Sequence, residues 1–313
     1  MAARIAVAEY YQQQFGAVVE PQQVLLTAST SEAYSYCLKL IASPGSSVLI
    51  PQPSYPLLHF LLEAEGITPK PYFLHPVAGE WLLDRDSIRS AIDSNTKAII
   101  LVHPNNPTGH FLSPADIEWL IETTRNQLWL ISDEVFCDYR WSSTTTQLSS
   151  LTALGAGNCF TLSGLSKICA LPQMKLGWIV APADSVLQSR LELVADTYLS
   201  VSAPIQAATP GWLQHRAQFQ KPIQERCREN LLRIPAALQG SPWAMLPVEA
   251  GWMAILKGPV GIDEESIALS LLQSGISVHP GYYYDLPFQP SLVLSLLTPW
   301  ADLEPGLKAL TSS

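Results

Sequence analysis

The stretch Thr161–Trp178 reads TLSGLSKICALPQMKLGW and places one lysine, Lys167, in a run of small and apolar residues. A second lysine, Lys175, follows eight residues later, ahead of a leucine, a glycine and a tryptophan. Burial of an ammonium group is costly and usually lowers the pKa of the amine, which makes it nucleophilic. Lys167 is therefore either an ordinary lysine at a turn between a strand and a helix or a reactive amine. This stretch alone leaves both interpretations open.

The composition narrows the classes of function. Of the 313 residues, 48% are hydrophobic and 14% are charged, against a charged share of about a quarter in average domains. This predicts one large or two unequal domains with much buried surface, including an oligomer interface. The net charge of −9 argues against nucleic acid or an anionic membrane as a partner. We expect neither a signal peptide nor a membrane span, because no apolar run is long enough.

The cysteine and histidine patterns indicate no metal site. Five cysteines occur, with no CxxC pair and no close pairing with histidine, and the six histidines are scattered. This pattern predicts free thiols in a reducing cytoplasm and no zinc or other metal centre.

The first half of the chain alternates strand and helix patterns. Short apolar runs rich in β-branched residues predict strands at Val24–Thr27, Ser47–Ile50, Lys97–His103, Leu128–Asp133, Asn158–Leu162 and Leu176–Ala181. Helical patterns occupy Ser31–Ile41, a segment that starts at Ser113 with Pro114 at its first position, and Asp184–Tyr198. The alternation predicts an α/β fold with a mostly parallel sheet and helices on both faces.

The second half of the chain shows a different pattern of predicted helices and strands. A long helical region is expected from about Pro204 to Leu238. Strand, helix, strand and strand patterns then follow at Trp252–Leu256, Glu264–Gln273, Ile276–His279 and Leu292–Leu297. We therefore predict a large domain over residues 1–235 and a small C-terminal domain over residues 236–313.

Polar or small residues follow five of the predicted strands. These segments are TASTSEA at Thr27–Ala33, PQPSYP at Pro51–Pro56, HPNNPTG at His103–Gly109, SDEVF at Ser132–Phe136 and SGLSK at Ser163–Lys167. Ligand groups of open α/β sheets gather at the carboxyl ends of strands. We therefore expect the five segments to face one cleft.

Two of these segments could bind an anion. Ser29–Ser31 precede a helix, where free N–H groups and the helix dipole would hold a phosphate, unless Ser29 or Ser31 is only an N-cap. Lys175 and the hydroxyl groups of Ser163 and Ser166 could add charge and donors to the same anion.

The other segments could hold a planar, charged ring. Tyr55 could stack on it or be a packing aromatic, and Asn106 could donate to a phenolate oxygen or be only a turn residue. Asp133 ends an apolar strand, and a buried carboxylate needs a cationic partner such as a protonated ring nitrogen. Lys167 would form a Schiff base. Together these features describe the cofactor pyridoxal 5′-phosphate (PLP).

Here the chain resembles the class I/II aminotransferase family of fold-type I PLP-dependent enzymes. The resemblance is carried by LTASTSEA, PQPSYP, HPNNPTG, LISDEVF and SGLSKICALPQMKLGW, in the family's order. It implies a three-layer αβα large domain with a mostly parallel sheet, plus a smaller α+β C-terminal domain. It also implies a cytoplasmic homodimer that transfers an amino group between an amino acid, or an amine, and a 2-oxo acid by a ping-pong mechanism.

The resemblance also implies a role for each site residue. Lys167 would be the Schiff-base lysine and proton carrier, Asp133 would contact the ring nitrogen, and Tyr55 would stack on the ring. Cofactor contacts are implied for Ser29, Thr30, Asn106, Phe136, Ser163 and Lys175. The segment Thr197–Gln206 is similar to the family's dimer segment, from which Ser200 or Ser202 would reach a neighbour's phosphate.

Four features depart from the family pattern. The family usually has several dozen more residues before Ala3–Gly16, so the chain looks truncated at its N-terminus. Phe136 stands where a tyrosine is usual, so Asn106 lacks a companion donor to the ring oxygen. Lys175 replaces a phosphate-binding arginine, and Gly164 replaces a serine. The arginine that binds the substrate carboxylate in the family should fall near Val293 or Leu294, and neither of these side chains can bind a carboxylate. The hydroxyl groups of Tyr282–Tyr284 lie nearby in the sequence.

These departures keep other functions open. A β-elimination lyase or a decarboxylase would use the same lysine and aspartate. A non-catalytic PLP-binding domain, as in regulators that fuse an aminotransferase-like domain to a DNA-binding module, and a truncated, inactive homologue are further alternatives.

Overall fold

The structure of the protein is a computed structural model that describes residues 1–125, 127–141, 150–155 and 157–312. Its main sheet consists of β1 (Val24–Thr27), β2 (Ser47–Gln52), β3 (Thr68–Val77), β4 (Glu80–Leu83), β5 (Thr96–Val102), β6 (Trp129–Asp133), β7 (Cys159–Gly164) and β8 (Gly177–Val180). The strand order is β1-β8-β7-β6-β5-β2-β3-β4. Only β8 and β4 run against their neighbours, so β1, β2, β3, β5, β6 and β7 point in one direction.

Helices cover both faces of this sheet because its strands are apolar on both sides. On β2, for example, Val48 and Ile50 pack into one core cluster and Leu49 into another. The first face is covered by α2 (Thr30–Ile41), α3 (Leu57–Ala64) and α7 (Ser185–Tyr198). The second is covered by α1 (Ala2–Phe15), α4 (Arg85–Ala91), α5 (Pro114–Thr124) and α8 (Ala203–Gln214). The predicted three-layer architecture is confirmed.

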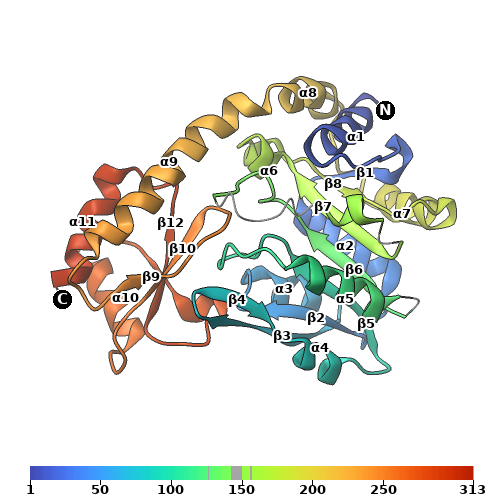
Figure 1. Cartoon of the computed structure of the whole chain (residues 1–313). Coiled ribbons are helices and arrows are strands. Elements are labelled where there is room, and N and C mark those ends of the chain that lie inside the picture. Colours follow the sequence, from blue (N-terminus) through green and yellow to red (C-terminus); the bar gives the residue numbers. More distant parts are fainter. Residues whose placement is uncertain (126, 142–149, 156, 313) are drawn as a thin grey trace.

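A smaller sheet forms beyond residue 243. It consists of β9 (Ala244–Met245), β10 (Met253–Lys257), β11 (His279–Pro280) and β12 (Ser291–Ser295), in the order β11-β12-β10-β9. The helices α9 (Arg216–Ala237), α10 (Glu264–Gln273) and α11 (Trp300–Ser312) pack against it. In Figure 1, α9 runs along the top from α8 toward this second sheet. The predicted division at residues 235 and 236 falls in the last turn of α9 and stays a prediction.

Most predicted elements form within one or two residues of the expected bounds. The Ser113 hydroxyl accepts the N–H of Asp116 at 3.1 Å and caps α5, as its pattern predicted. The strand expected at Ile276–His279 is wrong except at His279. The N–H of Ile276 instead donates to Leu271 at 2.9 Å and closes the end of α10, so this residue cannot pair with β12. The long helical region is also divided, at His215, into α8 and α9.

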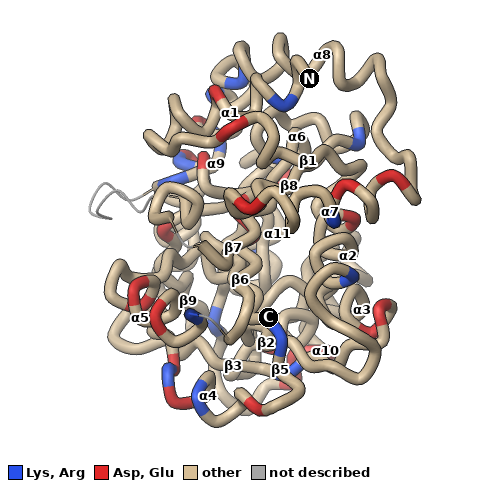
Figure 2. Tube along the Cα trace, turned by 90° about the vertical axis from the view of Figure 1, so that its right-hand side faces the viewer, with Lys and Arg blue, Asp and Glu red and all other residues tan. Residues whose placement is uncertain are grey.

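Charged residues are dispersed over the described chain. Figure 2 shows Lys and Arg positions interspersed with Asp and Glu along the trace. Among the described residues, no helix is both long and apolar enough to cross a bilayer.

Candidate active site

Five strand ends meet at one edge of the main sheet. Because β1, β2, β5, β6 and β7 are parallel, the segments that follow them all leave the sheet at its carboxyl edge. The five polar segments therefore share one edge of the sheet, and Lys167 follows the strand next to the one that Asp133 ends.

Lys167 lies in α6 (Leu165–Ile168), the short helix that directly follows β7. Its Nζ lies over two aromatic rings, 5.4 Å from the ring centroid of Phe136 and 4.9 Å from that of Trp252. Its carbonyl oxygen accepts the hydroxyl of Tyr139 at 2.7 Å. Burial lowers the pKa of the amine, and the carboxylate of Asp133 partly offsets this. Lys167 is therefore a half-buried amine held in an aromatic corner.

Asp133 is the last residue of β6 and is buried. Its carboxylate accepts the hydroxyl of Tyr34 at 3.0 Å and the N–H of Val135 at 3.2 Å. Burial raises the pKa of Asp133 to about 6, and the charge of Lys167 opposes this rise. The carboxylate is therefore held by neutral donors and would gain from a cationic partner.

The N-terminus of α2 lies next to β8. Ser29 is its N-cap, and its hydroxyl accepts the N–H of Glu32 at 3.1 Å. The simpler interpretation of this side chain is therefore confirmed. No protein acceptor is found among the described residues for the N–H groups of Ser29 and Thr30, which remain able to bind an anion. A Cβ at Gly177 would lie 2.9 Å from the Ser29 carbonyl carbon and 3.1 Å from the Thr30 nitrogen, so glycine permits this close approach.

Other predicted site residues carry polar atoms without partners. Asn106 Oδ1 and Ser163 Oγ are buried and make no hydrogen bond within the described chain. Tyr55 is half-buried, and its pKa is raised by burial and then by the charge of Asp133, which places its phenol in the field of that carboxylate. Lys175 is exposed, with a left-handed φ of 52°.

The aromatic wall of the site includes residues that sequence reasoning assigned differently or missed. Phe136 is buried and packs edge-on against Trp252, with ring centroids 5.4 Å apart. Trp252 and Tyr34 were not singled out, because nothing in their local sequence shows that they approach Lys167 and Asp133. The signal that could have found Trp252 is its position at the start of a strand that the sequence does predict.

The C-terminal residues considered for the substrate side take different positions. Tyr282 and Tyr283 are exposed, whereas Tyr284 is buried and its hydroxyl lies 2.9 Å from His279 Nδ1. Val293 is buried in the core cluster that includes Tyr284. Ser200 does not stand free, because its hydroxyl donates to Glu32 and shares a hydrogen bond with Tyr36 in the same chain.

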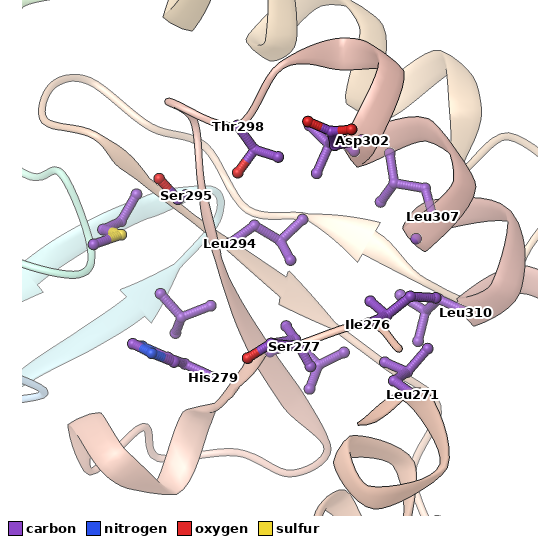
Figure 3. A pocket seen from close by; sticks show the side chains of 16 residues that line it. Leu271, Ile276, Ser277, His279, Leu294, Ser295, Thr298, Asp302, Leu307 and Leu310 are labelled. Carbon is purple, nitrogen blue, oxygen red and sulfur yellow. The ribbon is translucent and has the colours of Figure 1, made fainter. Parts of the chain in front are cut away.

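A cavity of about 200 Å³ opens within the small C-terminal part. Figure 3 shows it beside β12, with Leu294, Ser295, Thr298, Asp302 and Leu307 around it. Val293 and Leu294 line this cavity, but none of the predicted catalytic and cofactor-binding residues does, so it is distinct from the corner around Lys167. The described residues also include no group of three or more His, Cys, Asp or Glu that could hold a metal ion.

Comparison with known proteins identifies a family that matches almost the whole chain. Residues 1–310 match the family model "Aminotransferase class I and II". Curated relatives include tyrosine aminotransferase of Mus musculus, 31% identical over 58% of this chain and 39% of that protein. Nicotianamine aminotransferase 1 of Oryza sativa subsp. japonica is 28% identical over 71% of this chain and 46% of that protein. S-alkyl-thiohydroximate lyase SUR1 of Arabidopsis thaliana is 30% identical over 68% of this chain and 47% of that protein. The chain thus spans less than half the length of these relatives.

Solved structures share the fold. A Thermus thermophilus aspartate aminotransferase double mutant superimposes with a TM-score of 0.89 at 22% identity, covering 99% of this chain and 81% of that chain. An alanine aminotransferase from Pyrococcus furiosus gives a TM-score of 0.88 at 22% identity, with the same coverage.

Proposed function

We propose, since this chain belongs to the class I and II aminotransferase family, that it is a PLP-dependent aminotransferase. It would transfer an amino group between an amino acid, or an amine, and a 2-oxo acid by a ping-pong mechanism. The observation that carries the proposal is the pairing of a buried carboxylate, Asp133, with a half-buried lysine of lowered pKa, Lys167, at adjoining strand ends.

The residues present fit this cofactor. Among the described residues, Asp133 has no close cation other than Lys167, and the Ser163 hydroxyl, which can donate, has no partner. Such groups are costly when buried and unpaired, and a polar ligand would satisfy them. When bound, PLP supplies an aldehyde for the amine and a pyridinium ring that withdraws electrons.

The chain's own residues would divide the work as follows. Asp133 holds a proton on the ring nitrogen. Tyr55 flanks the ring, and Phe136 packs at its side. Asn106 donates its amide to the ring oxygen. Lys167 would hold the cofactor through its amine and would accept the proton from the substrate's α carbon, for which its lowered pKa suits it.

The phosphate would lie at the N-terminus of α2. The N–H groups of Ser29 and Thr30 would donate hydrogen bonds to it, and the helix dipole favours its negative charge. Ser163 adds a hydroxyl. Lys175 adds a charge from the turn before β8, as a flexible point charge rather than a bidentate fork.

A second candidate is a PLP-dependent lyase. The observation that favours it is the similarity to an S-alkyl-thiohydroximate lyase over 68% of this chain. A transaminase would convert the bound cofactor to its amine form with an amino donor. A lyase would release its products without a 2-oxo acid acceptor, and a binding-only protein would do neither.

The first test is the visible absorption spectrum of the chain with added PLP. We expect a band that bleaches with an amino donor and returns with a 2-oxo acid, and Lys167→Ala should abolish it. Lys257→Ala is the matched control, because Lys257 also packs over an aromatic ring, 5.2 Å from the Phe288 centroid, and should keep the band. An equal band in Lys167→Ala would reject the assigned lysine.

We also propose that the protein is a cytoplasmic homodimer. Five free, buried cysteines support a reducing compartment. Exposed apolar side chains on α7 support an interface between two copies, and this surface is tested below.

A further inference from the structure

Trp252 forms part of the wall around Lys167. It directly precedes β10 and is 8% exposed. The Lys167 amine lies over its ring at 4.9 Å. Phe136 and Tyr139 pack edge-on against it, with ring centroids at 5.4 Å and 4.9 Å. These three contacts fix the indole in the aromatic corner beside the Lys167 amine.

The indole N–H of Trp252 is a buried donor without an acceptor. Nε1 makes no hydrogen bond within the described residues. Buried tryptophans normally find a partner for this group, and an unpaired buried donor is destabilising. Phe136, on the adjoining wall, has no donor of its own. A ligand oxygen in this corner would therefore find Trp252 as a ready donor.

We infer that Trp252 donates its indole N–H to the phenolate oxygen of PLP held by Lys167, an assignment that rests on the function proposed above. In PLP the ring carbon that bears this oxygen adjoins the carbon that bears the aldehyde. A ring joined to Nζ would carry this oxygen beside Nζ, which lies 4.9 Å from the centroid of the Trp252 ring. An anionic oxygen is also the stronger acceptor for an N–H group. Trp252 thereby provides the hydrogen-bond donor that the side chain of Phe136 lacks.

The test is a pH titration of the visible absorption band of the PLP-bound chain, with Trp252→Phe as the variant. Phenylalanine keeps an aromatic ring at this position but removes the N–H together with one ring of the indole, so the lost volume needs its own control. Because the donor stabilises the deprotonated oxygen, we expect the pKa of the band to rise by roughly one unit in the variant. The dissociation constant of PLP, measured by equilibrium dialysis, should rise with it.

Two further proteins separate the hydrogen bond from packing. Trp243→Phe is the matched control, because Trp243 is buried in the same core cluster and makes no contact with Lys167 among those described; it should leave the pKa of the band unchanged. Phe136→Tyr, added to Trp252→Phe, places a hydroxyl on the adjoining wall and should bring the pKa back down. An unchanged pKa in Trp252→Phe, or an equal rise in Trp243→Phe, would overturn the inference.

The native chain offers a measurement that needs no stable variant. One of its nine tryptophan indole N–H resonances should move downfield when PLP is added. If none moves while the visible band forms, the inference fails and the proposed function stands. If the native chain forms no band, both fail together.

Discussion

Asp133 shows how one residue sets the electrostatics of the site. It ends a strand whose other residues are apolar except for Ser132, and its carboxylate has two neutral donors, Tyr34 and Val135. The raised pKa is a direct result of burial that these donors only partly offset. A pyridinium nitrogen beside Asp133 would lower the pKa of its carboxyl group, because an opposite charge favours the ionised form.

The first prediction concerns the stability of the cofactor-free chain. Burial moves the pKa of Asp133 from 3.8 to about 6. Between these values the native chain holds a proton that the unfolded chain has lost, so its stability falls as pH rises through this window. The contribution lost is at most about 3 kcal/mol.

Asp133→Asn should remove this dependence. Thermal unfolding from about pH 4 to about pH 6 should show the variant gaining stability relative to the native chain as pH rises, without PLP. A constant difference between the two proteins would show that Asp133 does not titrate there. PLP should bind the variant more weakly, since the ring nitrogen loses its anionic partner.

Elements distant in the sequence are fixed to one another by a few buried polar contacts. Asp138 accepts the hydroxyl of Tyr10 at 2.8 Å and the side-chain amide of Gln220. These bonds join α1 to α9, which are about two hundred residues apart in the chain. The N-terminus of α2 also approaches β8 closely, and this approach depends on the absence of a side chain at Gly177.

Substitution of Gly177 tests that contact. In Gly177→Ala the new Cβ would lie 2.9 Å from the Ser29 carbonyl carbon, so the turn before α2 must shift. We expect PLP affinity to fall by roughly tenfold, measured by equilibrium dialysis, together with an overpacking cost of about 1–3 kcal/mol in denaturant unfolding.

The matched control for this substitution is Gly211→Ala. A Cβ at Gly211, inside α8, would meet no atom within 4 Å, so alanine there should stabilise the helix by about 0.5–1 kcal/mol and leave PLP binding unchanged. If Gly177→Ala is destabilised but binds PLP normally, the glycine serves packing only.

At the scale of the whole molecule, the notable surface is the C-terminal half of α7. Leu193 is 70% exposed and Leu199, just after the helix, is 85% exposed. A monomer rarely presents several large apolar side chains together unless the patch has a function. The exposure of these two leucines supports the proposed interface between two copies, and Leu199 directly precedes Ser200.

The full chain should therefore sediment as a dimer in analytical ultracentrifugation. Leu193→Glu should raise the dimer dissociation constant by roughly tenfold or more, since it would bury a charge in an apolar contact. Val260→Glu is the control, because Val260 is 90% exposed and lies in the loop before α10. A monomeric native chain, or equal effects of both variants, would contradict the proposed interface.

The sequence by itself did not predict β3, β4, α1, α3 or α4. It determined the other six strands of the main sheet and the five polar segments at its carboxyl edge. These features are local: apolar runs, caps such as Ser113, and turn residues act within a few positions. The identities of Lys167 and Asp133 as candidates also followed from local context, a charge within apolar residues.

Only the tertiary structure decided which side chains surround those two residues. Tyr34 reaches Asp133 from α2, and Trp252 reaches Lys167 from the start of β10, across separations of about a hundred and about eighty-five residues. Contacts of this kind depend on how whole elements pack, and no local pattern of apolar and polar residues encodes them.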